Sequence, residues 1–292
     1  HPLMPLGMPT IIYGDGGSAK SILGIGFGLT CLLPWEANPF DLIPPPKSMC
    51  PLYLDWEMDL PTFKYRLQLY LKGHSLPAVE MSYRRCYLPL AQDLEHIQNI
   101  VADTGADLLI VDSLGAATGG DLNQSEGPLA FFAALRQLNV TALVIAHTSK
   151  DREGDRGVYG NVHFRNYARS VWECRKQQEV DADDLYIALL HRKANVSKEF
   201  KPLGFHLSFS PNSLLVQQAD PTTVAGVIER LGLKAQIRAL LKLGPQNIHD
   251  IIKALGKPKQ VPPRLSELKA AGLVVLLPDK SWALSSPRQE GE

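Results

Sequence analysis

The sequence has few cysteines, no long hydrophobic run and no net excess of charge. No stretch of about 18 uncharged apolar residues occurs in its 292 residues, which argues against a membrane span. The chain opens directly into an apolar strand, so we expect no signal peptide and a cytoplasmic protein. Four scattered cysteines lack metal-ligand spacing, and we expect them to be buried or unreactive thiols in a reducing compartment: Cys31, Cys50, Cys86 and Cys174.

Basic and acidic residues are equal in number, 30 of each, but they are unevenly distributed along the chain. Residues 221–292 contain 11 Lys and Arg against 6 Asp and Glu, and the rest of the chain has the opposite imbalance. A basic segment attached to a slightly acidic one indicates that the basic segment contacts a polyanion. The alternative is a solvated helical domain whose lysines have no such partner.

A glycine-rich segment lies between a short apolar strand, residues 10–13, and a helix-like run, residues 22–29. Strand, glycine loop, Lys-Ser and helix in this order are typical of a P-loop, whose backbone N–H groups surround a polyphosphate. We expect Lys20 to reach the β- and γ-phosphates of ATP, and the Ser21 hydroxyl to bind Mg²⁺. The predicted nucleotide contacts are Gly14, Asp15, Gly16, Gly17, Ser18, Ala19, Lys20, Ser21 and Ile22.

One position departs from the usual P-loop pattern. Ala19 stands where a second glycine is usual. We expect the alanine to be tolerated because the position begins the helix, where φ is negative and a Cβ fits.

The first 215 or so residues alternate between strand and helix patterns. This alternation predicts an α/β fold with a mostly parallel, twisted sheet and helices on both faces, and with the ligand beyond the carboxyl ends of the strands. An alternating strand at 205–209 is expected to complete a terminal hairpin, and the six prolines within 34–51 predict an irregular excursion. The predicted strands are 10–13, 52–54, 108–111, 142–146 and 185–190, and the clearest helices are 62–72, 90–104 and 128–138.

A change of pattern near residues 217–223 predicts a second domain. Three helices and a two-stranded wing predict a winged helix-turn-helix. The helical patterns lie at 223–242, 246–255 and 262–271, and the wing strands at 273–277 and 282–284. We therefore expect a RecA-like domain over 1–217, a winged-helix domain over 222–286 and a disordered tail over 287–292.

Two predicted strands end in acidic residues that suit nucleotide chemistry. The strand 108–111 precedes Asp112, which fits the Walker B position and would hold Mg²⁺; the alternative is an aspartate that caps the next turn. The strand 52–54 precedes two acids. A carboxylate there can polarise the attacking water, and we assign this general-base role to Glu57, with Asp55 in reserve. The alternative is a surface acid pair.

A third predicted strand ends at His147, which could sense the γ-phosphate and signal to the next loop. The alternative is that this lone histidine has only a structural role. The segment 150–162 is glycine-rich and charged, which predicts a mobile loop, and 115–128 is similar. The basic side chains Lys150, Arg152 and Arg156 suit the backbone of single-stranded nucleic acid. Both loops also contain acidic residues, so a solvated loop remains the alternative.

Basic residues also occur on the predicted hairpin turn, residues 191–195. Arg192 or Lys193 could there reach a neighbouring subunit's γ-phosphate in a ring or filament, as an arginine finger does. The alternative is an ordinary basic hairpin tip.

In the small domain, Arg264 and Lys269 lie on the candidate recognition helix and Lys280 lies on the wing. A nucleic-acid-binding winged helix would place these side chains on phosphates and base edges of DNA or RNA. The same domain type can instead dock a protein partner.

The P-loop and the strand-end motifs of the larger domain, in this order and spacing, resemble the RecA-like ATPase core over about residues 8–210. Residues 13–21, 52–57, 108–113 and 146–150 are most similar to the RepA-type branch of hexameric replicative helicases and related phage or plasmid ATPases, and residues 166–172 resemble the helix after its second DNA-binding loop.

The resemblance implies roles for the residues singled out above. It implies ATP hydrolysis with Lys20 and Ser21 on phosphate and metal, and with Asp112 on Mg²⁺. It also implies that Glu57 is the base and His147 the sensor. DNA would be contacted through the loops near 115–127 and 150–163, and Lys193, with Arg192 beside it, would be the cation supplied in trans.

We therefore predict a DNA-dependent ATPase, a helicase or recombinase-type motor in replication or recombination. It would bind single-stranded DNA and act as a homo-oligomeric ring or filament, such as a hexamer. The alternative is an ATP-switched regulator or loader with slow turnover. A kinase of small metabolites is disfavoured because the sequence has no lid or acceptor-site signature.

Overall fold

The computed structural model describes residues 3–148, 157–179, 182–196, 198–228 and 231–285. Two compact units divide the chain, one formed by residues 1–224 and the other by residues 225–292. No described helix is long and apolar enough to cross a bilayer.

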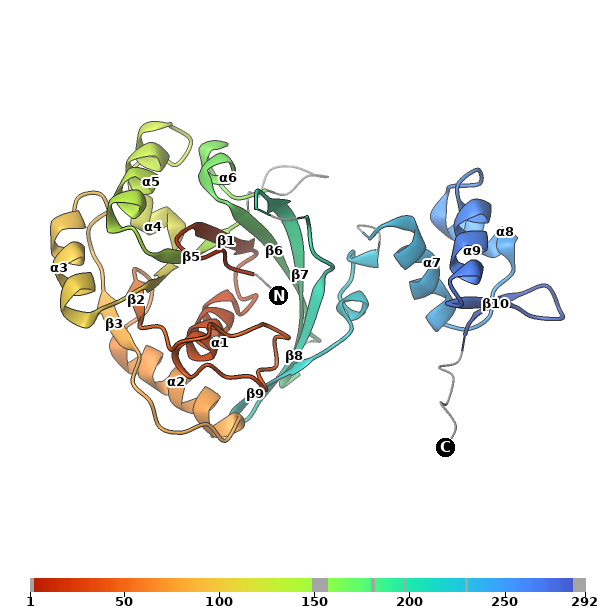
Figure 1. Cartoon of the computed structure of the whole chain (residues 1–292), viewed down its shortest axis with the longest axis horizontal. Coiled ribbons are helices and arrows are strands. Elements are labelled where there is room, and N and C mark those ends of the chain that lie inside the picture. The colour runs from red at the N-terminus through yellow and green to blue at the C-terminus, as the bar shows by residue number, and fades with distance from the viewer. Residues whose placement is uncertain (1–2, 149–156, 180–181, 197, 229–230, 286–292) are drawn as a thin grey trace. The chain divides into compact units, whose positions relative to one another are not determined.

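The larger unit is built on a nine-stranded sheet in the order β3-β2-β4-β5-β1-β6-β7-β8-β9 (Figure 1). Strands β1 to β6 pair in parallel, and β7 to β9 extend the sheet by antiparallel pairing. The strands are β1 (Pro9–Gly14), β2 (Pro51–Asp55), β3 (Ser82–Arg85), β4 (Leu108–Asp112), β5 (Thr141–His147), β6 (Ser170–Gln177), β7 (Asp184–Ala194), β8 (Leu203–Phe209) and β9 (Leu214–Gln218).

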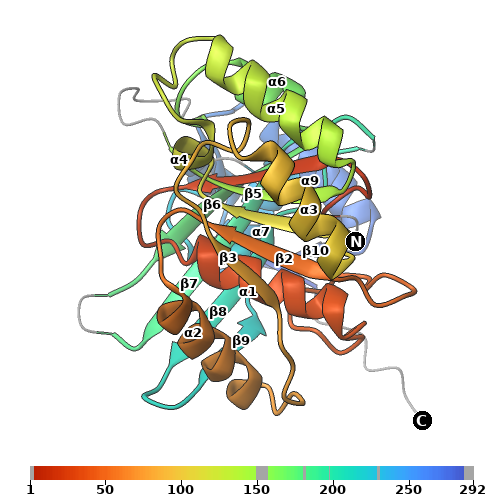
Figure 2. The same ribbon diagram turned by 90° about the vertical axis from the view of Figure 1, so that its left-hand side faces the viewer.

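Helices cover both faces of the parallel strands, as Figures 1 and 2 show. One face carries α1 (Lys20–Leu32) and α2 (Leu60–Gly73), and the other carries α3 (Leu94–Thr104), α4 (Leu114–Thr118), α5 (Glu126–Leu138) and α6 (His163–Tyr167). The predicted mostly parallel α/β sheet with helices on both faces is therefore confirmed.

The strand sequences explain this layering. In β4, Leu108 and Ile110 pack in the core under α1 and α2, whereas Leu109 and Val111 pack under the other helices. Side chains of a strand alternate between faces, so a strand buried on both faces reads as one continuous apolar run.

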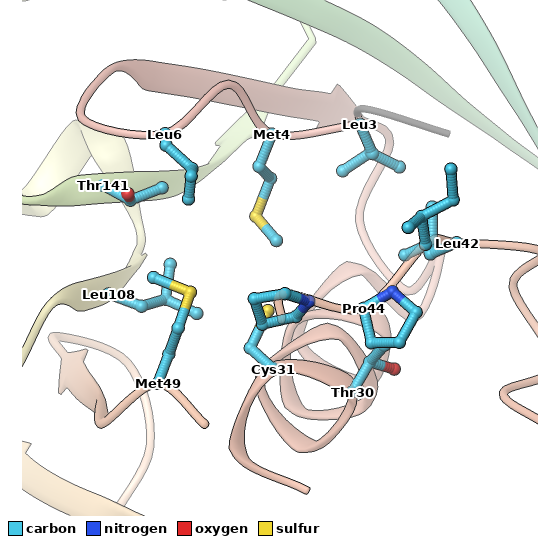
Figure 3. A pocket seen from close by; sticks show the side chains of 12 residues that line it. Leu3, Met4, Leu6, Thr30, Cys31, Leu42, Pro44, Met49, Leu108 and Thr141 are labelled. Atoms are coloured by element: carbon cyan, nitrogen blue, oxygen red, sulfur yellow. The ribbon is translucent and has the colours of Figure 1, made fainter. Parts of the chain in front are cut away.

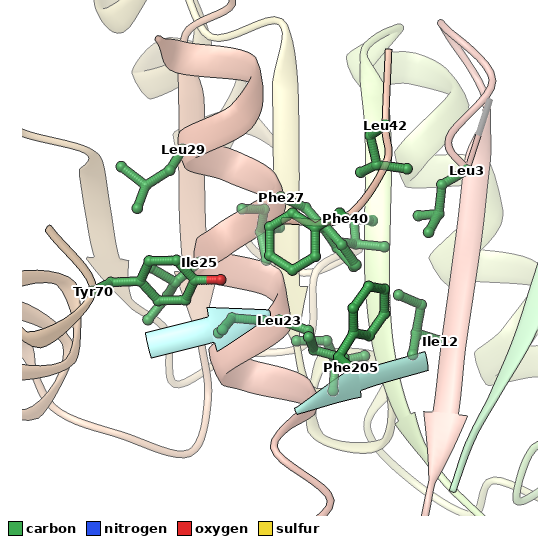
Figure 4. Close-up of a cluster of buried hydrophobic side chains, with 14 of the residues drawn as sticks. Leu3, Ile12, Leu23, Ile25, Phe27, Leu29, Phe40, Leu42, Tyr70 and Phe205 are labelled. Atoms are coloured by element: carbon green, nitrogen blue, oxygen red, sulfur yellow. The ribbon is translucent and has the colours of Figure 1, made fainter. Parts of the chain in front are cut away.

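The core under α1 is aromatic. Figure 4 shows Phe27, Phe40 and Phe205 gathered beside this helix, with Tyr70 of α2 nearby. A Cβ at Gly26 would collide with the Tyr70 hydroxyl and the Phe40 ring. The glycines within α1 therefore allow close packing despite their low helix propensity.

Several predicted elements differ from the structure. Residues 170–172 belong to β6, so the likeness of 166–172 to a helix is correct only for its first two residues, the end of α6. The 185–190 strand extends to Ala194, and it pairs antiparallel with β8 as expected for a hairpin. This hairpin does not end the sheet, because β9 pairs with β8 at the edge. These segments are strands because they pair with the strands on either side, and the local sequence pattern does not reveal such pairing. The irregular course predicted for residues 34–51 is confirmed up to the start of β2.

The smaller unit contains three helices and a two-stranded antiparallel sheet around its own core, which includes Ile237, Ile251 and Leu265. Its elements are α7 (Leu233–Lys242), α8 (Ile248–Leu255), α9 (Val261–Ala270), β10 (Val274–Leu276) and β11 (Trp282–Leu284). The helix predicted over 223–242 begins only at Leu233, after a 3₁₀ turn at Pro221–Thr223 and a positive φ at Gly226. The predicted tail, 287–292, lies outside the described residues.

Candidate nucleotide-binding site

The predicted P-loop connects β1 to α1, as the sequence pattern requires. β1 ends at Gly14, where a Cβ would collide with the backbone oxygen of Cys174 on β6. Gly17 has a φ of 66°, a conformation that glycine adopts without strain. The Ser18 hydroxyl donates to the Asp15 carbonyl at 2.8 Å and closes the turn. The loop therefore brings its backbone to the amino end of α1, where N–H groups favour an anion.

Lys20 begins α1 and is buried within this loop, with 6% of its surface exposed. Its ammonium donates to the carbonyls of Gly14 and Asp15 at 3.0 and 2.8 Å, and to the Ser18 hydroxyl at 3.2 Å. Burial lowers the pKa of Lys20, and nearby acidic groups oppose this shift. A phosphate next to the ammonium would add negative charge and further favour its charged form.

The conformation expected for Ala19 is wrong. Its φ is 54° and its ψ 24°, which is left-handed rather than helical. A Cβ in this region approaches the carbonyl oxygen of its own peptide unit and costs roughly 1–2 kcal/mol. The regular helix starts one residue later, at Lys20, so the turn of the loop extends through the alanine.

Asp112 lies at the carboxyl end of β4 and is buried, with 1% of its surface exposed. The Tyr53 hydroxyl donates to its Oδ2 at 2.7 Å, whereas Oδ1 is buried without a hydrogen-bond partner of good geometry among the described residues. Burial raises the pKa of Asp112, and the hydroxyls of Ser21 and Tyr53 oppose that rise.

These residues fit a divalent cation. A buried carboxylate oxygen without a partner, close to the Ser21 hydroxyl, is the donor chemistry that Mg²⁺ prefers. The described residues contain no group of three or more His, Cys, Asp or Glu side chains that could enclose a metal. A cation held by Asp112 and Ser21 would thus need most of its oxygen ligands from phosphate and water.

Glu57 follows β2 by two residues and keeps 43% of its side chain exposed. Its Oε1 accepts a hydrogen bond from the Ser113 hydroxyl and lies 3.4 Å from Nε2 of His147. The carboxylate is therefore oriented by two neighbours from β4 and β5 while remaining open to water.

The reserve candidate, Asp55, has a structural role. It is fully buried, and its Oδ1 accepts the N–H groups of Glu57 and Met58 at 2.8 Å each. Tyr83 donates to its Oδ2 at 3.3 Å, and Arg85 lies 3.6 Å from Oδ1. Asp55 thus fixes the turn that carries Glu57, and it does not line the nucleotide cavity described below.

His147 ends β5, and about half of its side chain is exposed. The next residue, Thr148, donates to Oδ1 of Asp15 at 2.5 Å and so joins the end of β5 to the P-loop. Sequence reasoning missed Ser113 and Thr148 because a hydroxyl after a strand is an ordinary feature. Their positions after Asp112 and His147 were the available signal.

One cavity of about 360 Å³ brings the predicted groups together. Residues 17–22 of the P-loop, Asp112, Glu57 and His147 line it, whereas the predicted contacts Gly14, Asp15 and Gly16 are not part of its wall. Arg66 of α2 also lines it, and no sequence pattern had indicated this residue. The predicted nucleotide and metal residues therefore share one site at the carboxyl ends of β1, β2, β4 and β5.

The basic pair of β7 lies apart from this cavity. Arg192 donates to Oε2 of buried Glu173 at 2.7 and 2.5 Å, and Arg175 donates to Oε1 at 2.7 Å. The Lys193 ammonium donates to the carbonyls of Arg165, Asn166 and Ala168 at 2.6 to 2.8 Å. Both residues lie within β7 rather than in a turn, and both have partners in their own chain.

The predicted nucleic-acid contacts are divided between the two units. Lys150, Arg152 and Arg156 lie outside the described residues. In the smaller unit, Lys269 and Lys280 are exposed. Arg264 is exposed as well, but it pairs with Glu267 at 2.6 Å, and Glu267 also contacts Lys234.

Comparison with known proteins complements this geometry. No curated protein sequence matches the chain. Among solved structures, the KaiC-like protein PH0186 of the hyperthermophilic archaeon Pyrococcus horikoshii OT3 is similar, with a TM-score of 0.49 and 16% identity over 73% of this chain and 90% of that chain. The profile of the family AAA_25, described as an AAA domain, matches residues 1–153. Because that match takes in more than half of the sequence and includes the P-loop, β2, β4 and β5, the chain belongs to this AAA domain family.

Proposed function

We propose that the chain hydrolyses ATP with Mg²⁺ and couples the reaction to DNA. The observation that carries the first part is the convergence of Lys20, Ser21, Asp112, Glu57 and His147 on one cavity. A phosphate-binding loop, a candidate metal carboxylate and an open carboxylate are the groups that phosphoryl transfer to water requires.

In the proposed reaction, Lys20 binds the β- and γ-phosphates in exchange for its contacts with the loop carbonyls. Glu57 accepts a proton from water while the water oxygen attacks the γ-phosphorus. The bond to the β-phosphate oxygen breaks, and its electron pair leaves with ADP. Ser113 and His147 hold Oε1 of Glu57 in position, and His147 senses the γ-phosphate. Mg²⁺ bound by Ser21 and Asp112 would neutralise charge on the phosphates.

The coupling to DNA rests on the sequence resemblance to RepA-type helicases and on charge. Residues 221–292 carry an excess of basic residues, and Lys269 and Lys280 are exposed there. Three helices followed by a two-stranded antiparallel sheet support the assignment of this unit as a winged helix. We propose that it contacts a DNA duplex or a protein partner, and that the chain works as a homo-oligomeric helicase or recombinase-type motor.

A second function is favoured by one specific observation. Arg192 and Lys193, the candidates for a cation supplied in trans, hold Glu173 and the end of α6 within their own chain. An arginine finger contributes roughly 10³–10⁵-fold to turnover. A protein that cannot release either residue would hydrolyse ATP slowly, as an ATP-switched regulator or loader does.

The test is ATP hydrolysis by the full chain with and without single-stranded DNA, together with its mass in solution with a non-hydrolysable ATP analogue. Glu57→Gln should lower hydrolysis about 10²–10⁴-fold and retain nucleotide binding. Glu80→Gln changes an exposed acid outside the cavity and is the matched control.

The outcomes separate the proposals. Full activity in Glu57→Gln would show that the catalytic assignment is wrong. Stimulation by DNA with nucleotide-dependent assembly supports the motor. Slow, DNA-indifferent hydrolysis by a monomer supports the regulator.

A further inference from the structure

A second cavity, of about 270 Å³, lies at the other end of α1 from the P-loop. Its walls come from the segment before β1, from the last turns of α1, from the first residues of β4 and β5, and from the loop that follows α1 (Figure 3). We call residues 34–49 of that loop the strap. Figure 3 shows Met4, Met49, Leu108 and Cys31 around the central space.

The strap is anchored firmly to α1, so the cavity is a built feature of the fold. The Met49 N–H donates to the Cys31 carbonyl at 3.0 Å, and the Ser48 hydroxyl donates to the Leu32 carbonyl at 2.5 Å. Inside the strap, Asn38 is 7% exposed, and its amide donates to the carbonyls of Trp35 and Leu42 at 2.8 Å each. Such buried, satisfied amide networks hold a loop in one conformation.

Among the residues that the structure describes, the cavity wall contains no charged side chain, and the polar side-chain groups it does contain are neutral or already bonded. The Thr30 hydroxyl donates to the Gly26 carbonyl at 3.0 Å, and the Thr141 hydroxyl accepts the Gly7 N–H at 2.9 Å. Burial, with a smaller effect of Asp107, raises the pKa of the Cys31 thiol to about 12, so the thiol stays neutral. A charged or strongly polar ligand would lose its hydration here and find little to replace it.

The size and mouth of the cavity suit a small ligand. An apolar cavity of about 150 Å³ already accommodates benzene, and this one is larger. Leu6 and Ile43 flank it with 67% and 80% of their surfaces exposed, which leaves apolar area for a ligand to cover. We propose that this cavity binds an uncharged apolar small molecule, such as a compound of one or two fused rings or a short branched chain.

The site is separate from the nucleotide site. Lys20 and the cavity residue Thr30 lie ten residues apart on α1, or about 15 Å along the helix axis. β4 and β5 likewise begin at the cavity, with Leu108 and Thr141, and end at the nucleotide site. An apolar ligand and ATP would therefore bind at the same time, and this proposal does not depend on ATP hydrolysis.

The experiment is a fluorescence titration of the full chain with N-phenyl-1-naphthylamine, an uncharged probe. A matched titration uses 8-anilino-1-naphthalenesulfonate, which has the same rings and a sulfonate. We expect saturable binding of the neutral probe to one site. The sulfonate should bind at least about tenfold more weakly, because the wall cannot compensate a charge. A saturating non-hydrolysable ATP analogue should not displace the neutral probe.

Two variants locate the probe. Leu6→Asp places a charge at the mouth on an exposed side chain and should weaken binding about tenfold or more. Leu243→Asp, an 81%-exposed leucine of the smaller unit, is the control and should leave binding unchanged. Cys31→Phe should fill the cavity and remove binding while the protein stays folded.

Three results would overturn the proposal. They are the absence of saturable binding, equal binding by Leu6→Asp, and displacement of the probe by the ATP analogue. If Leu6→Asp instead alters the mass of the protein in solution and no probe binds, the cavity is a contact between copies of the chain.

Discussion

Polar side chains at the ends of the parallel strands meet in one cavity, whereas Arg192 and Lys193 of the antiparallel extension bond to groups outside that cavity. Lys20 and Lys193 illustrate the contrast, since each ammonium donates to three oxygens and burial lowers the pKa of each. The acceptors of Lys20 are in the loop that lines the nucleotide cavity. The acceptors of Lys193 are the last carbonyls of α6 and its flanking residues.

The difference follows from strand direction. Parallel strands all end at the same edge, so a polar residue after any of them meets the others there. In an antiparallel pair the end of one strand lies beside the beginning of its neighbour, so a charged residue near that end meets side chains of the neighbouring strand. Arg192 of β7 accordingly meets Glu173 within β6.

The largest expected effect is on ATP hydrolysis at the nucleotide site, where the parallel strands end. Lys20→Met removes the ammonium that would bind the phosphates, and we expect ATP hydrolysis to fall about 10²–10³-fold, the usual loss for one such donor. Steady-state phosphate release measures this.

Lys193→Met is the matched control. It leaves three carbonyls without their donor and should cost about 1–2 kcal/mol of stability, with full activity per folded molecule. A loss of activity larger than the loss of folded protein would instead support a role of Lys193 in trans.

The next effect is on the stability of the antiparallel part. Glu173→Gln removes the negative charge, 3% exposed, that two arginines share, and breaking a buried ion pair costs about 3–5 kcal/mol. We expect about 3 kcal/mol in urea unfolding, because Arg175 and Arg192 are themselves partly exposed. Arg175→Gln keeps the Arg192 contact and should cost less. If both variants lost the same free energy of unfolding, Glu173 would not be the residue that holds Arg175 and Arg192 together.

The sequence was sufficient for β1, β2, β4 and β5, the parallel strands that end at the nucleotide site. Buried strands read as apolar runs there, and Asp112, Glu57 and His147 follow them directly, so their convergence could be predicted from strand direction. Their partners could not be predicted, because Ser113 and Tyr53 become relevant only through register between strands. The parallel strand β3, with partly exposed Ser82–Arg85, was missed because it has no apolar run. β9 was also missed, although it begins with the apolar residues 214–216.

A smaller effect concerns the buried carboxylate of Asp112. Because burial raises its pKa in the folded protein, the fold binds this proton more tightly than the unfolded chain does. The stability that Asp112 contributes is therefore fully present below the pKa that it has in the unfolded chain. It is lost as the pH rises through the pKa that Asp112 has in the folded protein.

Asp112→Asn removes the ionised form and should stabilise the nucleotide-free protein by about 1 kcal/mol at pH 7, with no gain in acid. Urea unfolding at several pH values measures this, and Asp103→Asn on exposed α3 should show no such trend. Added Mg²⁺ and an ATP analogue should stabilise the natural protein more than Asp112→Asn. A variant less stable at pH 7 would contradict the burial argument.

The smallest effect tests the conformation of the P-loop itself. Ala19→Gly relieves the left-handed strain, worth roughly 1 kcal/mol, but the glycine also gives the unfolded chain more freedom. We expect a net gain of up to about 1 kcal/mol in urea unfolding. Asn139 also has a positive φ, 52°, at the end of α5, but asparagine tolerates this region better. Asn139→Gly should therefore gain less, and an equal gain at both sites would show that the Ala19 conformation stores no strain particular to alanine at the P-loop.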